Sequence, residues 1–203
     1  MATVSEAVPQ EPIRRYVNAA VAIHWITAMM VVVQVWLGFA FHSMERGPAR
    51  AELFTWHKTV GSLILVLAIA RLAVRLMNPP PPFPPELPRW ERVAATWNHR
   101  AFYFLLFALP LTGLIAISGG ADEGTTSLVG GIPFPLIPGL SEAAGDTSGT
   151  VDEYLVLTTL FLLVFHIGAA LKQQFIDRPG RTAGRMPPFQ PRTGETAVEY
   201  RTK

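Results

Sequence analysis

Long apolar stretches dominate the pattern of this chain. Residues 19–41, 59–70, 101–121 and 154–171 contain no Asp, Glu, Lys or Arg. Charge-free apolar runs of about 20 residues match the roughly 30 Å hydrocarbon core of a bilayer. The second run is short, but Arg71 and Arg75 can extend it because long basic side chains reach the interface while their stems stay buried. The pattern predicts an all-α fold, an integral membrane bundle of four transmembrane helices at about 18–42, 54–76, 97–118 and 152–175.

The segments between these runs set the expected domain boundaries. Residues 1–17 form an N-terminal arm, residues 18–175 the transmembrane domain and residues 176–203 a basic C-terminal tail. The connector 78–88 contains seven prolines, which exclude a helix and favour an extended chain. Residues 119–151 form the longest loop, and its apolar part 132–140 is expected to lie on the membrane surface.

The distribution of basic residues predicts the orientation. Of the 17 Lys and Arg residues, 14 fall in the N-terminal arm, the second connector with its helix ends, and the tail. Loops rich in Lys and Arg stay in the cytoplasm. We therefore expect a multi-pass protein of the bacterial cytoplasmic membrane with both termini cytoplasmic. The first run is too long for a signal peptide and no A-x-A-like cleavage site follows it, so it is expected to remain as a helix.

Composition removes several classes of function. Only 16% of the residues are charged, against about 25% in soluble domains. Cysteine is absent, which excludes disulfides, iron–sulfur clusters and covalently attached haem. The net charge is only +2 and the basic residues sit near helix ends, so membrane lipid is an expected partner and nucleic acid is not.

Histidines are the candidate chemistry. His24 lies about two turns into the first helix and His166 about two turns from the end of the fourth, so the two share one depth near the cytoplasmic side. Ionisable residues inside a membrane are costly and usually functional. Two imidazoles at one depth on different helices are what a bis-histidine haem needs. The alternatives are simple interhelical hydrogen bonds and a zinc site, for which no acidic or Cys ligand lies at that depth.

A second, outer level contains His57 at the start of the second helix. Gly61 lies on the same helix face, and Gly38 lies on the first helix near the face of His24, so both could leave room for a flat porphyrin. We expect His42 and His99 to lie at the two interfaces, where histidines often face only lipid headgroups.

The order of these motifs resembles the bacterial cytochrome b561 family of four-helix, di-haem membrane proteins. The likeness runs from about residue 14 to 180 and rests on these matches: Arg15-Tyr16, Ile23-His24-Trp25, Trp56-His57-Lys58-Thr59-Val60-Gly61, Ala70-Arg71-Leu72, Arg75, His99, Ala108-Leu109-Pro110-Leu111-Thr112-Gly113 and Phe165-His166-Ile167-Gly168-Ala169-Ala170-Leu171.

The resemblance implies haem b, one or two per chain. It assigns an inner haem iron to His24 and His166, and an outer one to His57 and a histidine 14 residues before His166. That position is Asp152. Three outcomes follow: His42 replaces the missing ligand, the outer haem is five-coordinate, or only the inner haem binds. We favour loss or alteration of the outer site.

Basic residues near the histidines are further candidates. Arg15, Arg71 and Arg75 could pair with haem propionates through charge-assisted bonds, and Lys58, next to His57, is a further cofactor-binding candidate. Their alternative role is to anchor helix ends at the interface. For Lys58 that alternative includes an interfacial ion pair with Asp152.

The resemblance implies an electron carrier between an outer-face donor, with superoxide as a candidate, and an inner-face ubiquinone or redox partner. Such a protein would be a superoxide:quinone oxidoreductase. The positions that align with quinone contacts hold Glu86 and Gln173, where the family has basic or imidazole groups. Two alternatives remain: a membrane anchor and electron-relay subunit of a separate dehydrogenase, and a haem-poor scaffold of the same fold.

Overall fold

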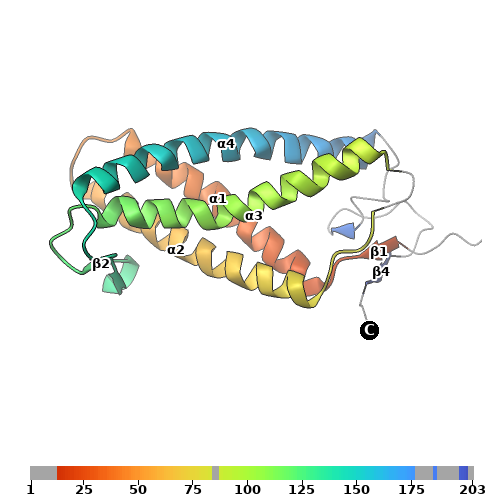
Figure 1. Cartoon of the computed structure of the whole chain (residues 1–203), viewed down its shortest axis with the longest axis horizontal. Coiled ribbons are helices and arrows are strands. Elements are labelled where there is room, and N and C mark those ends of the chain that lie inside the picture. The colour runs from red at the N-terminus through yellow and green to blue at the C-terminus, as the bar shows by residue number, and fades with distance from the viewer. Residues whose placement is uncertain (1–12, 84–86, 177–184, 187–196, 201–203) are drawn as a thin grey trace, which may run out of the picture.

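A computed structural model of the chain describes residues 13–83, 87–176, 185–186 and 197–200. Four long helices lie side by side along the molecule (Figure 1): α1 Asn18–His42, α2 Pro48–Met77, α3 Arg89–Ser118 and α4 Glu142–Phe175. Each is long and apolar enough to cross a membrane. The predicted four-helix transmembrane bundle is therefore confirmed.

Three helices begin earlier than the apolar runs predict. The fourth starts at Glu142 rather than near residue 152, because the Ser141 side chain accepts a hydrogen bond from the Ala144 amide and caps the helix. Helix α3 begins directly after Pro88, and Pro48 is the first residue of α2. These polar first turns carry no hydropathy signal. As a result His57 lies about two and a half turns inside α2 rather than at its start.

The helices form two tightly packed pairs. Helix α1 packs mainly on α2 and α3 mainly on α4, while α2 and α3 join the pairs. Leu37, Val60 and Ile64 form the buried core between α1 and α2. At the other pair, a Cβ on Gly119 would lie 2.5 Å from the Cα of Gly145, so only glycine permits this close crossing.

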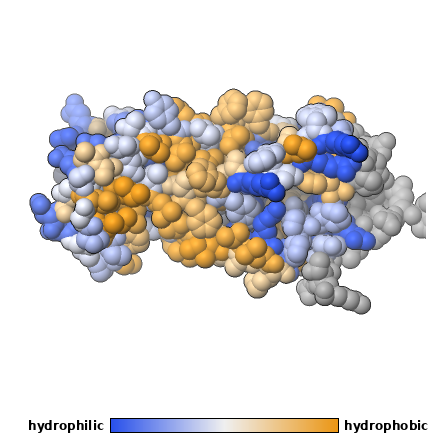
Figure 2. Space-filling view, viewed as in Figure 1, coloured by the Kyte–Doolittle hydropathy of each residue, from blue (hydrophilic) through white to orange (hydrophobic). Residues whose placement is uncertain are grey.

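The outer surface of the bundle is apolar along the middle and polar at both ends (Figure 2). Large side chains such as Trp36, Phe161 and Val164 are more than 60% exposed. A soluble protein rarely leaves so many large apolar groups open to solvent. This belt is the surface that lipid covers, which supports the reading as a multi-pass membrane protein.

The two ends of the bundle are built differently. At the terminal end, strand β1 (Ile13–Arg15) pairs in parallel with β4 (Ala197–Glu199). Arg185 also lies here, and its guanidinium donates to the carbonyl of Pro82 at 2.6 Å. Residues 1–12 of the expected arm, and 177–184, 187–196 and 201–203 of the expected tail, lie outside the described residues.

At the opposite end, which we call the loop end, a short hairpin of β2 (Thr125–Ser127) and β3 (Pro133–Pro135) covers α2, with the 3-10 turn η1 (Val129–Gly131) between its strands. Thr59 on α2 accepts a hydrogen bond from the Val129 amide at 3.0 Å. Within the part 132–140, which was expected to lie on the membrane surface, the Ile137 amide donates to the Ser118 hydroxyl of α3 at 3.0 Å.

Candidate haem site and the second histidine level

His24 on α1 and His166 on α4 meet near the terminal end of the bundle. The centroids of their rings lie 6.3 Å apart, with the ring planes at 61°. Two metal–nitrogen bonds of about 2 Å each, plus the radius of each five-membered ring, come to about 6 Å. The spacing therefore suits two imidazoles on opposite sides of one iron, as predicted from their matched depth.

Asn98 on α3 orients the ring of His166. The side-chain nitrogen Nδ2 of Asn98 lies 3.0 Å from Nδ1 of His166, and the ring of Phe102 packs edge-on against the same imidazole with centroids 5.2 Å apart. A hydrogen bond at Nδ1 leaves Nε2 for a metal and fixes the tautomer. If iron binds Nε2 of His166, Nδ1 keeps its proton, and the Asn98 amide must then turn its oxygen toward Nδ1. Which atom of an amide faces a ring is assigned from the hydrogen-bond network.

Arg71 on α2 holds the other ring. Its guanidinium donates to Nδ1 of His24 at 2.9 Å and also stacks over the Tyr103 ring, where Arg75 stacks as well. Guanidinium groups only donate, so this contact requires the His24 proton on Nε2. Iron on Nε2 requires the opposite tautomer, and Arg71 would then have to release Nδ1.

His99 lies closer to His166 than its place in the sequence suggested. It was expected at the interface, but its ring is edge-on to that of His166, with centroids 5.8 Å apart. Its Nδ1 donates to the Ala95 carbonyl at 2.6 Å. His99 therefore lines the same site as His24 and His166 instead of facing headgroups.

The second level, nearer the loop end, contains His57 on α2. Its Nε2 lies 3.0 Å from Nε2 of Gln34 on α1. A Cβ on Gly61 would lie 3.1 Å from that Gln34 amide nitrogen, and a Cβ on Gly38 would lie 3.4 Å from Cε1 of His57. The two glycines do leave space, as expected, but side chains of the protein itself fill it.

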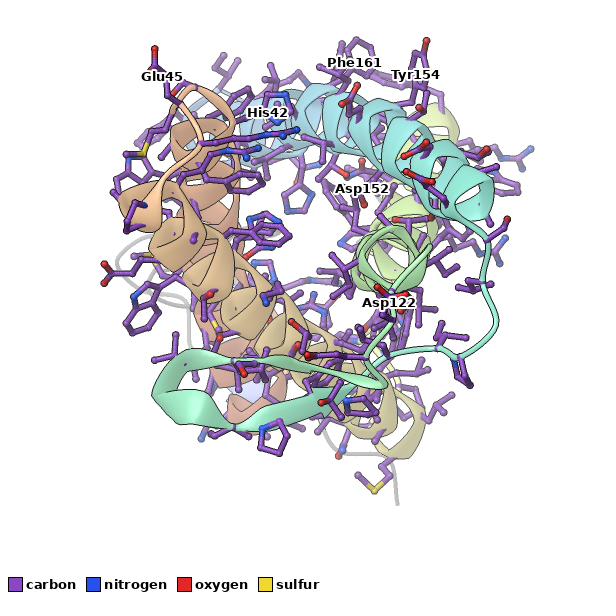
Figure 3. All side chains as sticks on the ribbon, turned by 90° about the vertical axis from the view of Figure 1, so that its left-hand side faces the viewer. His42, Glu45, Asp122, Asp152, Tyr154 and Phe161 are labelled. Atoms are coloured by element: carbon purple, nitrogen blue, oxygen red, sulfur yellow. The ribbon has the colours of Figure 1, made fainter. Side chains whose placement is uncertain are left out.

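Asp152 stands on α4 where a second histidine would complete this level. Its Oδ1 accepts a hydrogen bond from the Thr112 hydroxyl on α3 at 2.6 Å, and Ser148 donates to the Thr112 carbonyl at 2.9 Å. Seen from the loop end, Asp152 lies on the inner side of α4, whereas Tyr154 and Phe161 point away from the bundle (Figure 3).

The remaining candidates lie apart from both sets of rings. Lys58 donates to the Thr126 hydroxyl at 2.6 Å and so tethers the hairpin, and the structure records no ion pair between it and Asp152 among the described residues. Arg15 donates to Asn18 at 2.6 Å on the surface. His42 is exposed at the end of α1, and no contact with His57 is found in the described part of the chain.

The two levels therefore differ in their fit to haem. At the terminal end two imidazoles face each other and Asn98 holds one of them by the nitrogen that iron does not use. Only the described residues were searched for a cluster of three or more His, Cys, Asp or Glu side chains that could hold a metal, and none was found.

Two partners of the rings carried a weak signal in the sequence. Gln34 is the only carboxamide in the apolar run 19–41, and Asn98 directly precedes a histidine. A carboxamide inside a membrane helix needs a partner, and histidine is the natural one. Which histidine it meets depends on helix packing, which the pattern does not specify.

Comparison with known proteins yields consistent matches. A family model described as prokaryotic cytochrome b561 matches residues 15–188. The chain is 30% identical to cytochrome b561 homolog 2 of Escherichia coli (strain K12), over 81% of this chain and 87% of that protein. It is 26% identical to the probable superoxide oxidase CybB of Yersinia pestis, over 86% of this chain and 97% of that protein.

Proposed function

The chain belongs to the prokaryotic cytochrome b561 family and is a membrane b-type cytochrome of electron transfer, and we propose that His24 and His166 hold its haem iron. The observation that carries the proposal is the 6.3 Å separation of the two ring centroids across helices α1 and α4. Residues 18–175 form the haem-binding unit.

The protein groups around this site have distinct tasks. The bound iron supplies one-electron exchange, and its axial ligands, hydrogen bonds and burial set the potential. Asn98 would hold His166 in the tautomer that leaves Nε2 free once its amide turns to present the oxygen, in place of Nδ2, to Nδ1. Arg71, once it releases His24, offers its guanidinium to a haem propionate, for which bidentate charge-assisted bonding is favourable. The aromatic face of Tyr103 keeps that guanidinium nearby.

The terminal end is proposed to face the cytoplasm. The basic residues gather there, as the positive-inside rule requires. The acceptor is proposed to be ubiquinone or a redox partner that docks at this end. Oε1 of Gln174 near the end of α4 is buried and has no hydrogen-bond partner in the described part of the chain, so it could accept from a hydroquinone hydroxyl. Of the two positions aligned with quinone contacts, Gln173 is half-buried directly before Gln174, and Glu86 lies outside the described residues.

A second candidate function is superoxide oxidation with the electron passed to a quinone. The observation that favours it is the 26% identity with the probable superoxide oxidase of Yersinia pestis over nearly the whole of both chains. Superoxide added to the oxidised protein in a stopped-flow spectrometer would reduce the haem at a rate that rises linearly with superoxide concentration. Reduction only by quinol or by a protein donor would contradict this second candidate.

Spectra of detergent-purified variants test the haem ligands. We expect His24→Ala and His166→Ala each to lose the low-spin Soret and α bands, because one imidazole cannot hold a six-coordinate low-spin haem. His42→Ala is the matched control, since His42 is exposed and lies away from His24 and His166. An unchanged spectrum in His24→Ala or His166→Ala, or a colourless wild type, would contradict the proposed site.

A further inference from the structure

At the loop-end level of this bundle, side chains of the protein itself surround His57, and this bears on how many haems the chain binds. We propose that Gln34 and His57 form a hydrogen-bonded pair there, that no haem binds at this level, and that the chain carries a single haem. The inference rests on the proposed function only for the haem at the terminal end. Three observations support it.

Both ring nitrogens of His57 lie close to residues of α1, and Nδ1 has no hydrogen-bond partner among the described residues. Its Nε2, the nitrogen that usually binds metals, lies 3.0 Å from the Gln34 amide. Its Nδ1 is buried beside α1, where a Cβ on Gly38 would lie only 3.7 Å away. An imidazole binds iron through the lone pair of one nitrogen, so an iron at Nε2 would have to displace the Gln34 amide that lies 3.0 Å from it.

The space that a porphyrin edge would need is taken. The Gln34 amide lies against Gly61 so closely that a Cβ at Gly61 would be 3.1 Å from its nitrogen. On the other side the Phe41 ring packs against His57, with centroids 5.1 Å apart. A haem at this level would have to displace Gln34 and break its hydrogen bond to His57.

On α4, the position that would supply the second ligand holds Asp152 instead of a neutral side chain. Asp152 is bound to Thr112 on α3, and Thr112 in turn accepts a hydrogen bond from Ser148 through its carbonyl. The carboxylate therefore joins α3 to α4 and is not directed at His57. A negatively charged oxygen is also a poor axial partner for a low-spin b haem, whose usual ligands are neutral His and Met.

A single haem near the terminal end changes where electrons can enter. A donor at the loop-end surface would have no cofactor at its own level to receive the electron. Donor and acceptor would then exchange electrons with the same haem. The inference therefore favours a partner that docks at the terminal end over a small donor at the loop end.

Haem content of the full-length protein in detergent tests the inference. We expect about one haem per chain by pyridine haemochrome assay, unchanged in His57→Phe and abolished in His166→Ala. Two haems in the wild type, or loss of half of the haem in His57→Phe, would overturn the inference. Failure of the proposed function looks different, because then the wild type would contain no haem or would keep its haem in His166→Ala.

A redox titration of the wild type covers the case in which His57→Phe does not accumulate. One haem gives a single one-electron Nernst curve in the α band. Two components of similar amplitude would overturn the inference without any variant. The wild-type spectrum at each potential also shows whether a high-spin haem is present, as a five-coordinate haem on His57 would produce.

Discussion

The two levels of the bundle both contain histidine side chains, but the residues around those histidines differ. At the terminal end the rings of His24 and His166 face each other across α1 and α4, with Asn98 on one Nδ1. At the loop end the ring of His57 faces Gln34, and Asp152 is bound to Thr112. Both levels contain half-buried imidazole side chains. What separates them is which ring nitrogen each neighbour occupies.

Under our proposal, this difference would explain how a ligand site can be lost without loss of the fold. Replacing one ligand by Asp152 removes the reason to keep the porphyrin space open. A carboxamide on α1 then occupies that space and gives the remaining histidine a hydrogen-bond partner. Breaking this contact would leave Nε2 of His57 without a partner, in addition to Nδ1 of His57 and Oε1 of Gln34, and each such buried group costs about 1–3 kcal/mol. Four predictions test the comparison, beginning with the largest effect.

Rebuilding the second level should raise haem content most. In Asp152→His combined with Gln34→Gly, an imidazole replaces the carboxylate and the amide no longer fills the space beside Gly61. We expect haem per chain to rise from about one toward two, by pyridine haemochrome assay. Gln34→Gly alone is the matched control and should stay at one. A rise in that control would mean that the loop-end level binds haem without a second histidine.

Removing the hydrogen bond to His166 should weaken the terminal-end site. We expect Asn98→Leu to lower haem affinity roughly 10- to 100-fold, the usual effect of losing a group that orients a metal ligand. The midpoint potential should rise, because a less basic imidazole stabilises the oxidised iron less, and Asn98→Asp should lower it. Haem transfer to apomyoglobin and a redox titration measure the two effects.

Thr112→Val is the matched control for Asn98 at the other level, since Thr112 holds Asp152 in the same interhelical way. It should change neither haem affinity nor midpoint potential. An equal shift in both variants would mean that the potential responds to general packing of α3 on α4 and that the comparison between the levels is wrong.

The Gln34–His57 pair should stabilise the fold without affecting the haem. Gln34→Leu leaves the buried His57 ring without its partner and should lower the free energy of unfolding by about 1–3 kcal/mol. A double-mutant cycle with His57→Phe should give a coupling of about 0.5–1.5 kcal/mol. Thermal unfolding in detergent measures it, with haem content as the control. Additive effects would mean that the pair does not interact.

The smallest effect is expected at the ion pair between Lys172 and Glu91, 3.2 Å apart at the terminal end. Lys172 is 46% exposed, so solvent screens the attraction. Glu91→Gln should change stability by less than about 1 kcal/mol and leave the spectrum unchanged. A large loss of haem in this variant would show that the ends of α3 and α4 position Asn98 and His166.

The charge-free apolar runs predicted the four spans and the matched depth of His24 and His166, because bilayer thickness fixes where a helix enters and leaves. They did not predict the early start of α4, which depends on the Ser141 cap outside the apolar run. They also placed His99 at an interface. The angular position of a ring around its helix depends on how α3 and α4 cross at Gly119 and Gly145, which is a tertiary contact.

The number of b haems in the purified wild-type chain tests the account most directly. Haem by pyridine haemochrome and protein by amino-acid analysis give the ratio without any variant. A ratio of about one, in a low-spin form, is the predicted result for a single haem between His24 and His166. A ratio of about two would contradict the assignment of the loop-end level to the Gln34–His57 pair.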